Sequence, residues 1–217
     1  MSQAKVLTEK EVRKVLLYIA SRKHSTRNRA MFVVLNATGM RVGELAALRL
    51  CDVLSPTGEI VDEIRLAADQ TKGSRGRVVV LNQKAQEEIK NYLMTRFKLK
   101  DLLAVTMTDT SRALFTTQKN PNRGFTASTL AQHFHYMYKG AGIMGASSHS
   151  SRRSFITKLS EMGVSVRVLM DLAGFDDNEA WTIDERIANS FKDLELSDKV
   201  VVATGYTKGT EGIMREF

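Results

Sequence analysis

The sequence is poor in cysteine and in long apolar runs. Its one cysteine, Cys51, excludes an internal disulfide, and one thiol with four scattered histidines gives no zinc-type ligand spacing. We therefore expect no metal and no other cofactor. No apolar run approaches the roughly 18 residues that span a bilayer, and the opening MSQAKVLTEKEV lacks the apolar stretch of a signal peptide. These absences predict a cytoplasmic protein with no membrane partner.

Proline and acidic residues are also scarce. The two prolines, Pro56 and Pro121, both fall in expected loops. The 24 acidic residues are outnumbered by 32 lysines and arginines, and the resulting net charge of +8 favours a polyanionic partner. Basic residues gather at 22–29 and 72–77, whereas 176–185 is acidic. With 43% apolar residues over 217 positions, the chain has enough apolar material for a real core.

Apolar residues recur mostly at the helical period. This spacing predicts helices over 9–21, from Arg41 onward, over 83–97, over 127–139, and as two short helices between 145 and 174. It also predicts a helix that Ser25 or Thr26 caps and that Gly39 ends. Between 59 and 81 the runs EIVDEIRLAA and GRVVVL flank QTKGSR, which predicts a β-hairpin with Lys72 at or beside its turn. The expected fold is therefore mainly α with a small antiparallel β-sheet, an α+β protein.

The segment HSSRRSF, which begins at His149, places a histidine three residues before one arginine and four before another. Residues three apart in a helix project from the same side, so His149 and Arg152 present an imidazole and a guanidinium to one small anion. Arg153 points elsewhere. A phosphate of a nucleic acid backbone matches this pair of donors. Taken alone, the spacing more often marks a surface ion-pairing or helix-capping cluster.

Three segments in order carry a more specific signal: NATGMRVGELAALRLCDV, QTKGSRGRVVVLN and SSHSSRRSFITKLSEMGVSVRVLMDLAGF. Together they resemble the catalytic domain of the tyrosine recombinases, the phage-type integrase family, over roughly residues 5–174. Arg41 and Glu44 match the family's T-G-x-R-x-x-E-L block. Lys72 matches its β-hairpin lysine, and His149 with Arg152 matches its H-x-x-R box.

The resemblance implies a metal-free transesterification of DNA. In that reaction a tyrosine hydroxyl attacks a phosphodiester, forms a 3′-phosphotyrosyl link and releases a 5′-hydroxyl. Arg41 and Arg152 are then expected to clamp the phosphate oxygens, and Lys72 to protonate the leaving 5′-oxygen. His149 is expected to donate a hydrogen bond to the phosphate or to shuttle the proton of the nucleophile. Glu44 is expected to hold a helix or an arginine in place.

The sequence departs from the family pattern after Gly174. Family members usually continue with a histidine, whereas this chain has Phe175, which cannot donate the corresponding hydrogen bond. The family's tyrosine follows two to three helical turns later, but WTIDERI contains none. Tyr206 is the only tyrosine after the H-x-x-R box, 31 residues beyond Phe175. Tyr206 is therefore the candidate nucleophile, in cis or from a neighbouring protomer, and an ordinary tail aromatic is the alternative.

These features lead to one main hypothesis and two alternatives. We expect residues 1–174 to form a tyrosine recombinase catalytic-like domain and residues 175–217 to form a divergent C-terminal segment that is not a separate domain. The main hypothesis is a DNA integrase or site-specific recombinase from a mobile element that acts on double-stranded DNA, as a homo-oligomer. The first alternative is a DNA-binding recombinase-like protein with reduced or no catalytic activity. The second is a helix-turn-helix regulator, because the short helices around Gly163 resemble that motif.

Overall fold

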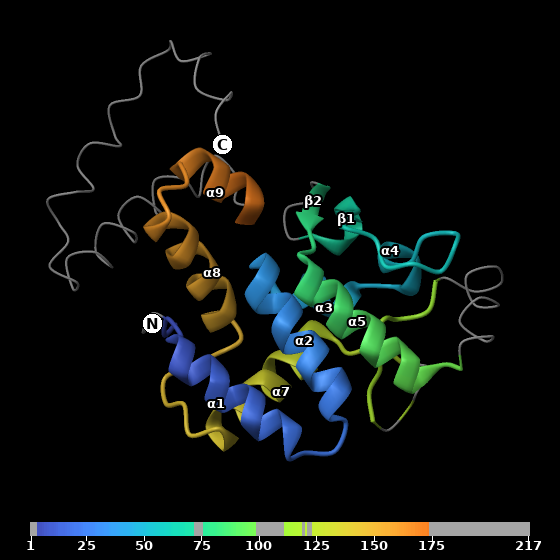
Figure 1. Ribbon diagram of the computed structural model, residues 1–217, viewed down its shortest axis with the longest axis horizontal. Helices are drawn as coiled ribbons and strands as arrows, with labels where there is room; N and C mark the ends of the chain where they lie inside the picture. The colour runs from blue at the N-terminus through green and yellow to red at the C-terminus, as the bar shows by residue number, and fades with distance from the viewer. Residues whose placement is uncertain (1–3, 72–75, 99–110, 119, 121–122, 174–217) are drawn as a thin grey trace, which may run out of the picture. The chain divides into compact units, whose positions relative to one another are not determined.

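The structure is a computed structural model that describes residues 4–71, 76–98, 111–118, 120 and 123–173. Helices predominate in these residues, and two strands pair in an antiparallel sheet (Figure 1). The helices are α1 (Glu9–Ala20), α2 (Ser25–Thr38), α3 (Val42–Ala47), α4 (Leu50–Val53), α5 (Gln83–Arg96), α7 (Ala127–Gly140), α8 (Ser150–Glu161) and α9 (Val166–Ala173), with strands β1 (Glu63–Leu66) and β2 (Arg77–Val80) and the 3-10 turn η1 (Ala68–Gln70). The expected mainly α fold with a small antiparallel sheet is confirmed. Among the described residues, no helix is both long enough and apolar enough to cross a membrane.

Helix α2 forms the centre of the fold. Six successive residues of this helix, from Ala30 to Leu35, are all buried. A helix that is apolar on every side is stable only when other elements surround it. Helices α1, α5 and α8 pack against α2 and provide that cover (Figure 1). The two ends of α2 consequently lie beside different elements. Polar side chains gather near Asn28 at its start and near Gly39 at its end.

The start of α1 follows the sequence signal closely. The backbone N–H of Glu11 donates to Thr8 Oγ1 at 3.3 Å, and the backbone N–H of Thr8 donates to Glu11 Oε2 at 3.1 Å. This reciprocal pair is a capping box, which satisfies two amides that the helix itself leaves without partners. Val15 and Ile19 then bury one face of α1 in the core.

The start of α2 differs from the prediction. Ser25 is the first helical residue, and the position before the helix is taken by His24 instead of Ser25 or Thr26. His24 has φ 59°, a left-handed conformation, and no side chain caps the helix. The serine and threonine that the pattern marked as caps lie inside the first turn. The first amides of α2 are therefore left without a side-chain acceptor.

The predicted β-hairpin is present but shorter than the sequence pattern. Strands β1 and β2 pair over four residues, with Leu66 opposite Arg77. The N-terminal part of the predicted strand does not join this sheet, because Ile60 pairs with Leu54 in an isolated bridge beside α4. Helix α4 itself was not expected. Lys72 lies outside the described residues, so its place at the turn stays a prediction.

Helices α8 and α9 form the expected tandem near the end of the described chain. Gly163 separates them with φ 81°, a left-handed conformation that favours glycine. The helical spacing in the sequence also predicts Met162, Val168 and Leu169 on apolar faces. Leu169 is buried, but Met162 and Val168 are 69% and 45% exposed. The prediction for these two residues was wrong because Met162 follows the last turn of α8, and the short helix α9 buries only a narrow stripe.

A polar network joins the start of α2 to the middle of α7. Arg27 Nε and Nη2 donate to Asn28 Oδ1 at 3.3 and 3.0 Å, and Arg27 Nη1 donates to the Thr116 carbonyl at 2.8 Å. His133 Nε2 lies 3.1 Å from the same Asn28 oxygen. Because that oxygen can only accept, we assign the ring proton of His133 to Nε2. Burial, followed by the nearby charges of Arg27 and His24, lowers the pKa of His133 to about 4.

This pKa predicts a loss of stability in mild acid. Between pH 6.5 and about 4 the unfolded chain binds a proton at His133 that the folded chain does not, so the unfolding free energy falls as the pH falls. The expected loss is roughly 2–3 kcal/mol across this window. Denaturant titrations at several pH values would measure it. This loss of unfolding free energy in acid is expected to disappear in His133→Gln, which keeps an N–H donor. It is expected to persist in the control His135→Gln, at an exposed residue.

Candidate active site

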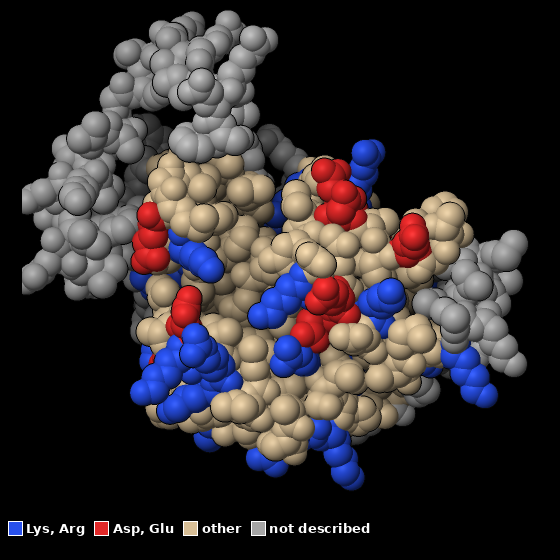
Figure 2. Space-filling view, in the orientation of Figure 1, with Lys and Arg blue, Asp and Glu red and all other residues tan. Residues whose placement is uncertain are grey.

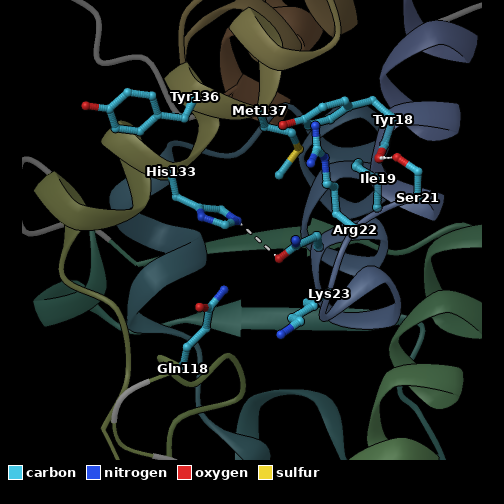
Figure 3. Close-up of a pocket in the computed structure, with 10 residues that line it drawn as sticks. Tyr18, Ile19, Ser21, Arg22, Lys23, Gln118, His133, Tyr136 and Met137 are labelled. Atoms are coloured by element: carbon cyan, nitrogen blue, oxygen red, sulfur yellow. Dashed lines mark hydrogen bonds between the residues drawn. The ribbon is translucent and has the colours of Figure 1, made fainter.

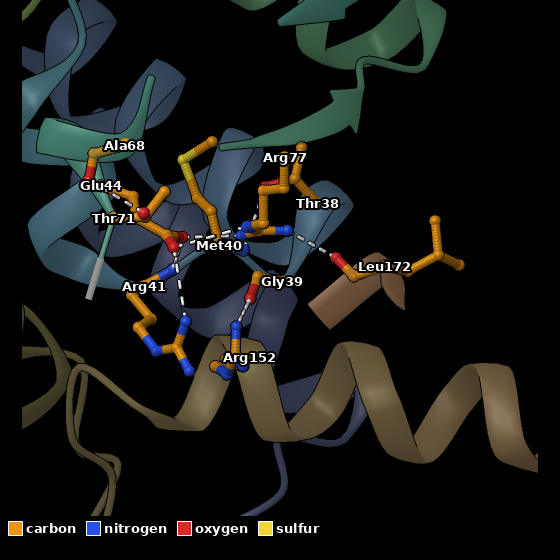
Figure 4. A network of polar contacts seen from close by, with 10 residues as sticks. All are labelled: Thr38, Gly39, Met40, Arg41, Glu44, Ala68, Thr71, Arg77, Arg152 and Leu172. Atoms are coloured by element: carbon orange, nitrogen blue, oxygen red, sulfur yellow. Dashed lines mark hydrogen bonds and ion pairs between the residues drawn. The ribbon is translucent and has the colours of Figure 1, made fainter. Parts of the chain in front are cut away.

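The turn after α2 brings α8 close to the start of α3. Gly39 ends α2 with φ 60°, and its N–H donates to the Leu35 carbonyl at 3.0 Å. A methyl group at Gly39 would overlap the ring of Phe155 on α8. Both the left-handed backbone and the close approach therefore require glycine. Arg152, one turn before Phe155, is buried and donates from Nη1 to the Gly39 carbonyl at 2.8 Å (Figure 4).

Arg41 follows two residues later, at the position that precedes α3. Its backbone N–H donates to Glu44 Oε2 at 2.6 Å, and its guanidinium lies 3.5 Å from Glu44 Oε1. Glu44 is buried, with a side chain that is 1% exposed, whereas the Arg41 side chain keeps 18% exposure. The expectation that Glu44 holds an arginine in place is confirmed. One carboxylate thus fixes both the backbone and the side chain of Arg41.

A second arginine on the same carboxylate was missed by the sequence analysis. Arg77, at the start of β2, donates from Nη2 to Glu44 Oε2 at 2.7 Å and from Nη1 to the Leu172 carbonyl at 2.6 Å (Figure 4). Leu172 lies in the last turn of α9, where helix carbonyls lack intrahelical donors. Arg77 therefore connects α3, β2 and α9. The sequence did contain a signal for the burial of Arg77. Side chains alternate between the two faces of a strand, and Arg77 shares a face with the buried Val79 and Leu81.

The cluster is positively charged. Arg41 and Arg77 contact one carboxylate, so these three side chains carry a net charge of +1, and Arg152 adds a guanidinium at Gly39. Two or more buried charges are stable only when they are paired and well hydrogen-bonded. Planar guanidinium groups held in this way can bind two oxygens of a phosphate at once. The arrangement suits an anion that gains negative charge during reaction.

His149 immediately precedes α8, the helix that carries Arg152. Its backbone N–H lies 3.3 Å from Ser147 Oγ, and its side chain is exposed. His149 occupies the N-cap position of α8, but within the described residues its imidazole makes no capping bond. Arg153 donates to the Ala4 carbonyl at 2.7 Å and so points away from the cluster, as expected. The structure brings Arg41 and Arg152 together around Gly39, with His149 one turn before Arg152.

The described tyrosine nearest in sequence to this cluster is unsuited to nucleophilic attack. The Tyr138 hydroxyl is buried and lies 2.8 Å from Ser151 Oγ. Burial raises the pKa of Tyr138 to about 12, against a weaker lowering by Ser151, so its phenolate is disfavoured. Lys72, Phe175 and Tyr206 lie outside the described residues. Lys72 as general acid and Tyr206 as nucleophile stay predictions.

The chain is similar to a family of known proteins. Residues 5–183 match the family model described as "Phage integrase family". The chain is 31% identical to tyrosine recombinase XerA of Pyrococcus furiosus over 171 residues, which cover 78% of this chain and 53% of that protein. It is 30% identical to tyrosine recombinase XerD of Rickettsia conorii over 165 residues, which cover 70% and 49%. The chain thus spans about half the length of these curated relatives.

Solved structures show the same fold. A crystal structure of XerA recombinase superimposes with a TM-score of 0.65 at 23% identity, over 90% of this chain and 65% of that one. The XerH site-specific recombinase bound to its palindromic difH substrate superimposes with a TM-score of 0.63 at 22% identity, over 91% and 52%. At these identities the likeness establishes the architecture. The expected tyrosine recombinase-like fold is confirmed.

Proposed function

Since the chain belongs to the phage integrase family, we propose that it is a site-specific DNA recombinase that breaks and rejoins strands through a 3′-phosphotyrosyl intermediate. One observation carries the proposal. Arg41 and Arg152, which lie 111 positions apart in the sequence, are both fixed at the turn around Gly39, one through Glu44 and the other through the Gly39 carbonyl. Such a pair of fixed guanidinium groups fits the oxygens of a DNA phosphodiester.

The proposed reaction is an in-line exchange of two phosphoester bonds. The Tyr206 oxygen attacks the phosphorus, and the bond from phosphorus to the 5′-oxygen breaks. The tyrosine proton leaves through His149 or water, and Lys72 gives a proton to the departing 5′-oxygen. Arg41 and Arg152 stabilise the additional negative charge on the phosphate oxygens in the transition state. The reverse reaction, with a 5′-hydroxyl of another strand, rejoins the DNA.

The proposed partner is double-stranded DNA. The chain carries a net charge of +8, which favours a polyanion. A structure of the Tn1549 transposon integrase is a complex with circular intermediate DNA, and the XerH structure contains its difH substrate, which supports this choice. We propose residues 1–174 as the catalytic unit and 175–217 as the segment that supplies the nucleophile, in a homo-oligomer assembled on DNA in the cytoplasm.

Covalent capture of DNA tests this function. The full chain is mixed with a pool of nicked duplexes of randomised sequence, in which the departing strand diffuses away after cleavage. We expect a denaturation-resistant complex in which peptide mapping places the DNA on Tyr206. Tyr206→Phe is expected to abolish the complex, and Tyr136→Phe, at an exposed tyrosine of α7, is expected to preserve it.

Two outcomes contradict the proposal in different ways. A complex that survives Tyr206→Phe would show that another residue is the nucleophile. Salt-sensitive DNA binding without any covalent complex would favour the alternative, a DNA-binding recombinase-like protein with reduced or no activity. Unaltered DNA affinity in the Arg41→Ala, Arg152→Ala double variant would favour the helix-turn-helix alternative, because a regulator of that class has no need of these arginines.

A further inference from the structure

A cavity of about 440 Å³ lies where the end of α1, the start of α2 and the middle of α7 meet (Figure 3). Its volume falls within the range of pockets that hold small ligands. The candidate active site lies at the other end of α2, a helix of 14 residues, which is about 20 Å long at 1.5 Å per residue. The cavity is therefore distinct from the cluster around Gly39.

The cavity is lined by two cations and by no acidic residue among those described. Arg22 and Lys23 both face it from the turn between α1 and α2 (Figure 3). Neither side chain makes an ion pair within the described part of the chain. The Arg22 guanidinium stacks over the Tyr18 ring, 4.5 Å from its centroid, which fixes its plane and leaves its N–H edge available.

A buried amide adds a neutral donor to the same cavity. Asn28 is 6% exposed and lines the cavity, and its Oδ1 accepts from Arg27 and from His133. Arg27 fixes the side-chain orientation, because a guanidinium can only donate and therefore requires the Asn28 oxygen. The Asn28 amide nitrogen makes no hydrogen bond to any residue that the structure describes. The nitrogen is not fully buried, so a ligand or water in the cavity can reach it.

The start of α2 contributes a positive field. No side chain caps this helix, whose first amides point out of its N-terminal end. The aligned peptide dipoles place a partial positive charge there. This feature alone is common at protein surfaces, but here it coincides with two unpaired cations and with a buried amide whose nitrogen has no partner in the described chain. All of these groups favour one kind of ligand, a compact anion with several acceptor oxygens.

We propose that the cavity binds a phosphate group, either from a nucleic acid backbone or from a free phosphate ester. The Asn28 amide and the Arg22 guanidinium donate to its oxygens, and Lys23 supplies a second charge. The inference does not depend on the proposed strand transfer, since it concerns binding at a separate place in the molecule.

Titration of the full chain with inorganic phosphate, followed by calorimetry and by the NMR signals of the Asn28 side-chain amide, tests the proposal. We expect one saturable site and a shift of these signals. Asn28→Asp keeps the acceptor for Arg27 and replaces the amide donor by a carboxylate oxygen. The variant is expected to bind phosphate at least about tenfold more weakly, because a charged hydrogen bond becomes a repulsion. Unchanged binding in Asn28→Asp, or no saturable binding by the wild type, would overturn the proposal.

A charge-matched pair of double variants provides the second arm. Arg22→Gln with Lys23→Gln is expected to abolish phosphate binding. Arg13→Gln with Lys14→Gln removes the same charge from an exposed part of α1 away from the cavity, and is expected to preserve it. An equal loss of phosphate affinity in the two double variants would overturn the proposal, because the net charge of the protein would then explain the binding.

Duplex DNA distinguishes the source of the phosphate. If the cavity holds a backbone phosphate, the Arg22 and Lys23 double variant should bind DNA several-fold more weakly than the Arg13 and Lys14 control, with a smaller salt dependence. If the cavity holds a free ester, the two variants should bind DNA equally, while adenosine 5′-monophosphate competes with inorganic phosphate in the wild type. DNA binding is measured without cleavage, so failure of the proposed recombinase reaction leaves this result interpretable.

Discussion

Arg152→Ala is expected to slow covalent capture of DNA by about a thousandfold, since removal of one donor to a developing oxyanion costs roughly 10²–10³ in rate. Arg152 is buried and held at the Gly39 carbonyl, so its charge is positioned before DNA arrives. The rate of complex formation in a single turnover measures the effect. Because the interaction strengthens in the transition state, the rate should fall much further than the affinity for DNA.

Arg153→Ala is the matched control for this prediction. It removes the same charge from the next residue of α8, where the guanidinium donates to the Ala4 carbonyl near the start of the chain. The capture rate of this variant is expected to stay within a few-fold of the wild-type rate. Equal slowing in the two variants would indicate an effect of net charge or of α8 stability, and would contradict the assignment of Arg152 to the phosphate.

Glu44→Gln is expected to lower the unfolding free energy by about 3 kcal/mol, because removal of one member of a buried charge network leaves its partners uncompensated. Glutamine retains the shape of the side chain and one acceptor oxygen. It no longer neutralises Arg41 and Arg77, whose side chains are 18% and 10% exposed. Denaturant unfolding measures the loss. The exposed control Glu9→Gln, on a side chain that is 85% exposed, should change stability by less than about 0.5 kcal/mol.

A compensating change separates charge from packing in the Glu44 prediction. Adding Arg77→Met to Glu44→Gln removes one of the two uncompensated charges and is expected to recover part of the lost stability. It should not restore DNA capture, because Arg41 still lacks the carboxylate that orients it. Two results would show that Glu44 does not stabilise the protein by neutralising Arg41 and Arg77. One is a loss of less than about 1 kcal/mol of unfolding free energy in Glu44→Gln, and the other is a double variant that is less stable than Glu44→Gln by as much as Arg77→Met alone costs.

Features that depend on local chemistry were predictable from the sequence. The spacing of Thr8 and Glu11 indicates the start of α1, and Gly39 indicates the end of α2, because capping and left-handed turns depend on a few neighbouring residues. The spacing of His149 and Arg152 predicted both on one helix, whereas the structure places Arg152 in α8 and His149 at the position just before it. The start of α2 was misplaced because His24 adopts a left-handed conformation that sequence propensity disfavours.

Features that depend on tertiary packing were not predictable in the same way. The sequence marks Arg77 as one basic residue among several, and only the folded chain shows it bridging Glu44 and the Leu172 carbonyl, 33 and 95 positions away. The cavity near Asn28 is a further example, because its lining comes from α1, α2, α7 and the segment at Gln118. Such pairings depend on how helices pack, which local patterns do not specify.

Arg41 and Arg152 were recognised by resemblance, whereas the role of Arg77 was found only in the structure. Arg41 and Arg152 belong to motifs with fixed local spacing, so each was recognisable separately. The reason that they lie close together is Gly39, whose missing side chain admits Phe155 and whose carbonyl accepts from Arg152. A motif identifies the residues, and the close contact between α8 and the turn after α2 shows why they meet.

A neutral methylphosphonate at the cleaved position tests whether Arg41 and Arg152 hold the charge of one DNA phosphodiester. The rate of covalent capture would be compared for wild type, Arg41→Ala and Arg152→Ala on phosphate and on methylphosphonate duplexes. We predict losses of about 10²–10³ on phosphate DNA, and much smaller losses on the methylphosphonate, which lacks the charge that the arginines stabilise. Equal losses on both substrates would contradict the claim, because they would show that the arginines support the structure and do not bind the reacting phosphate.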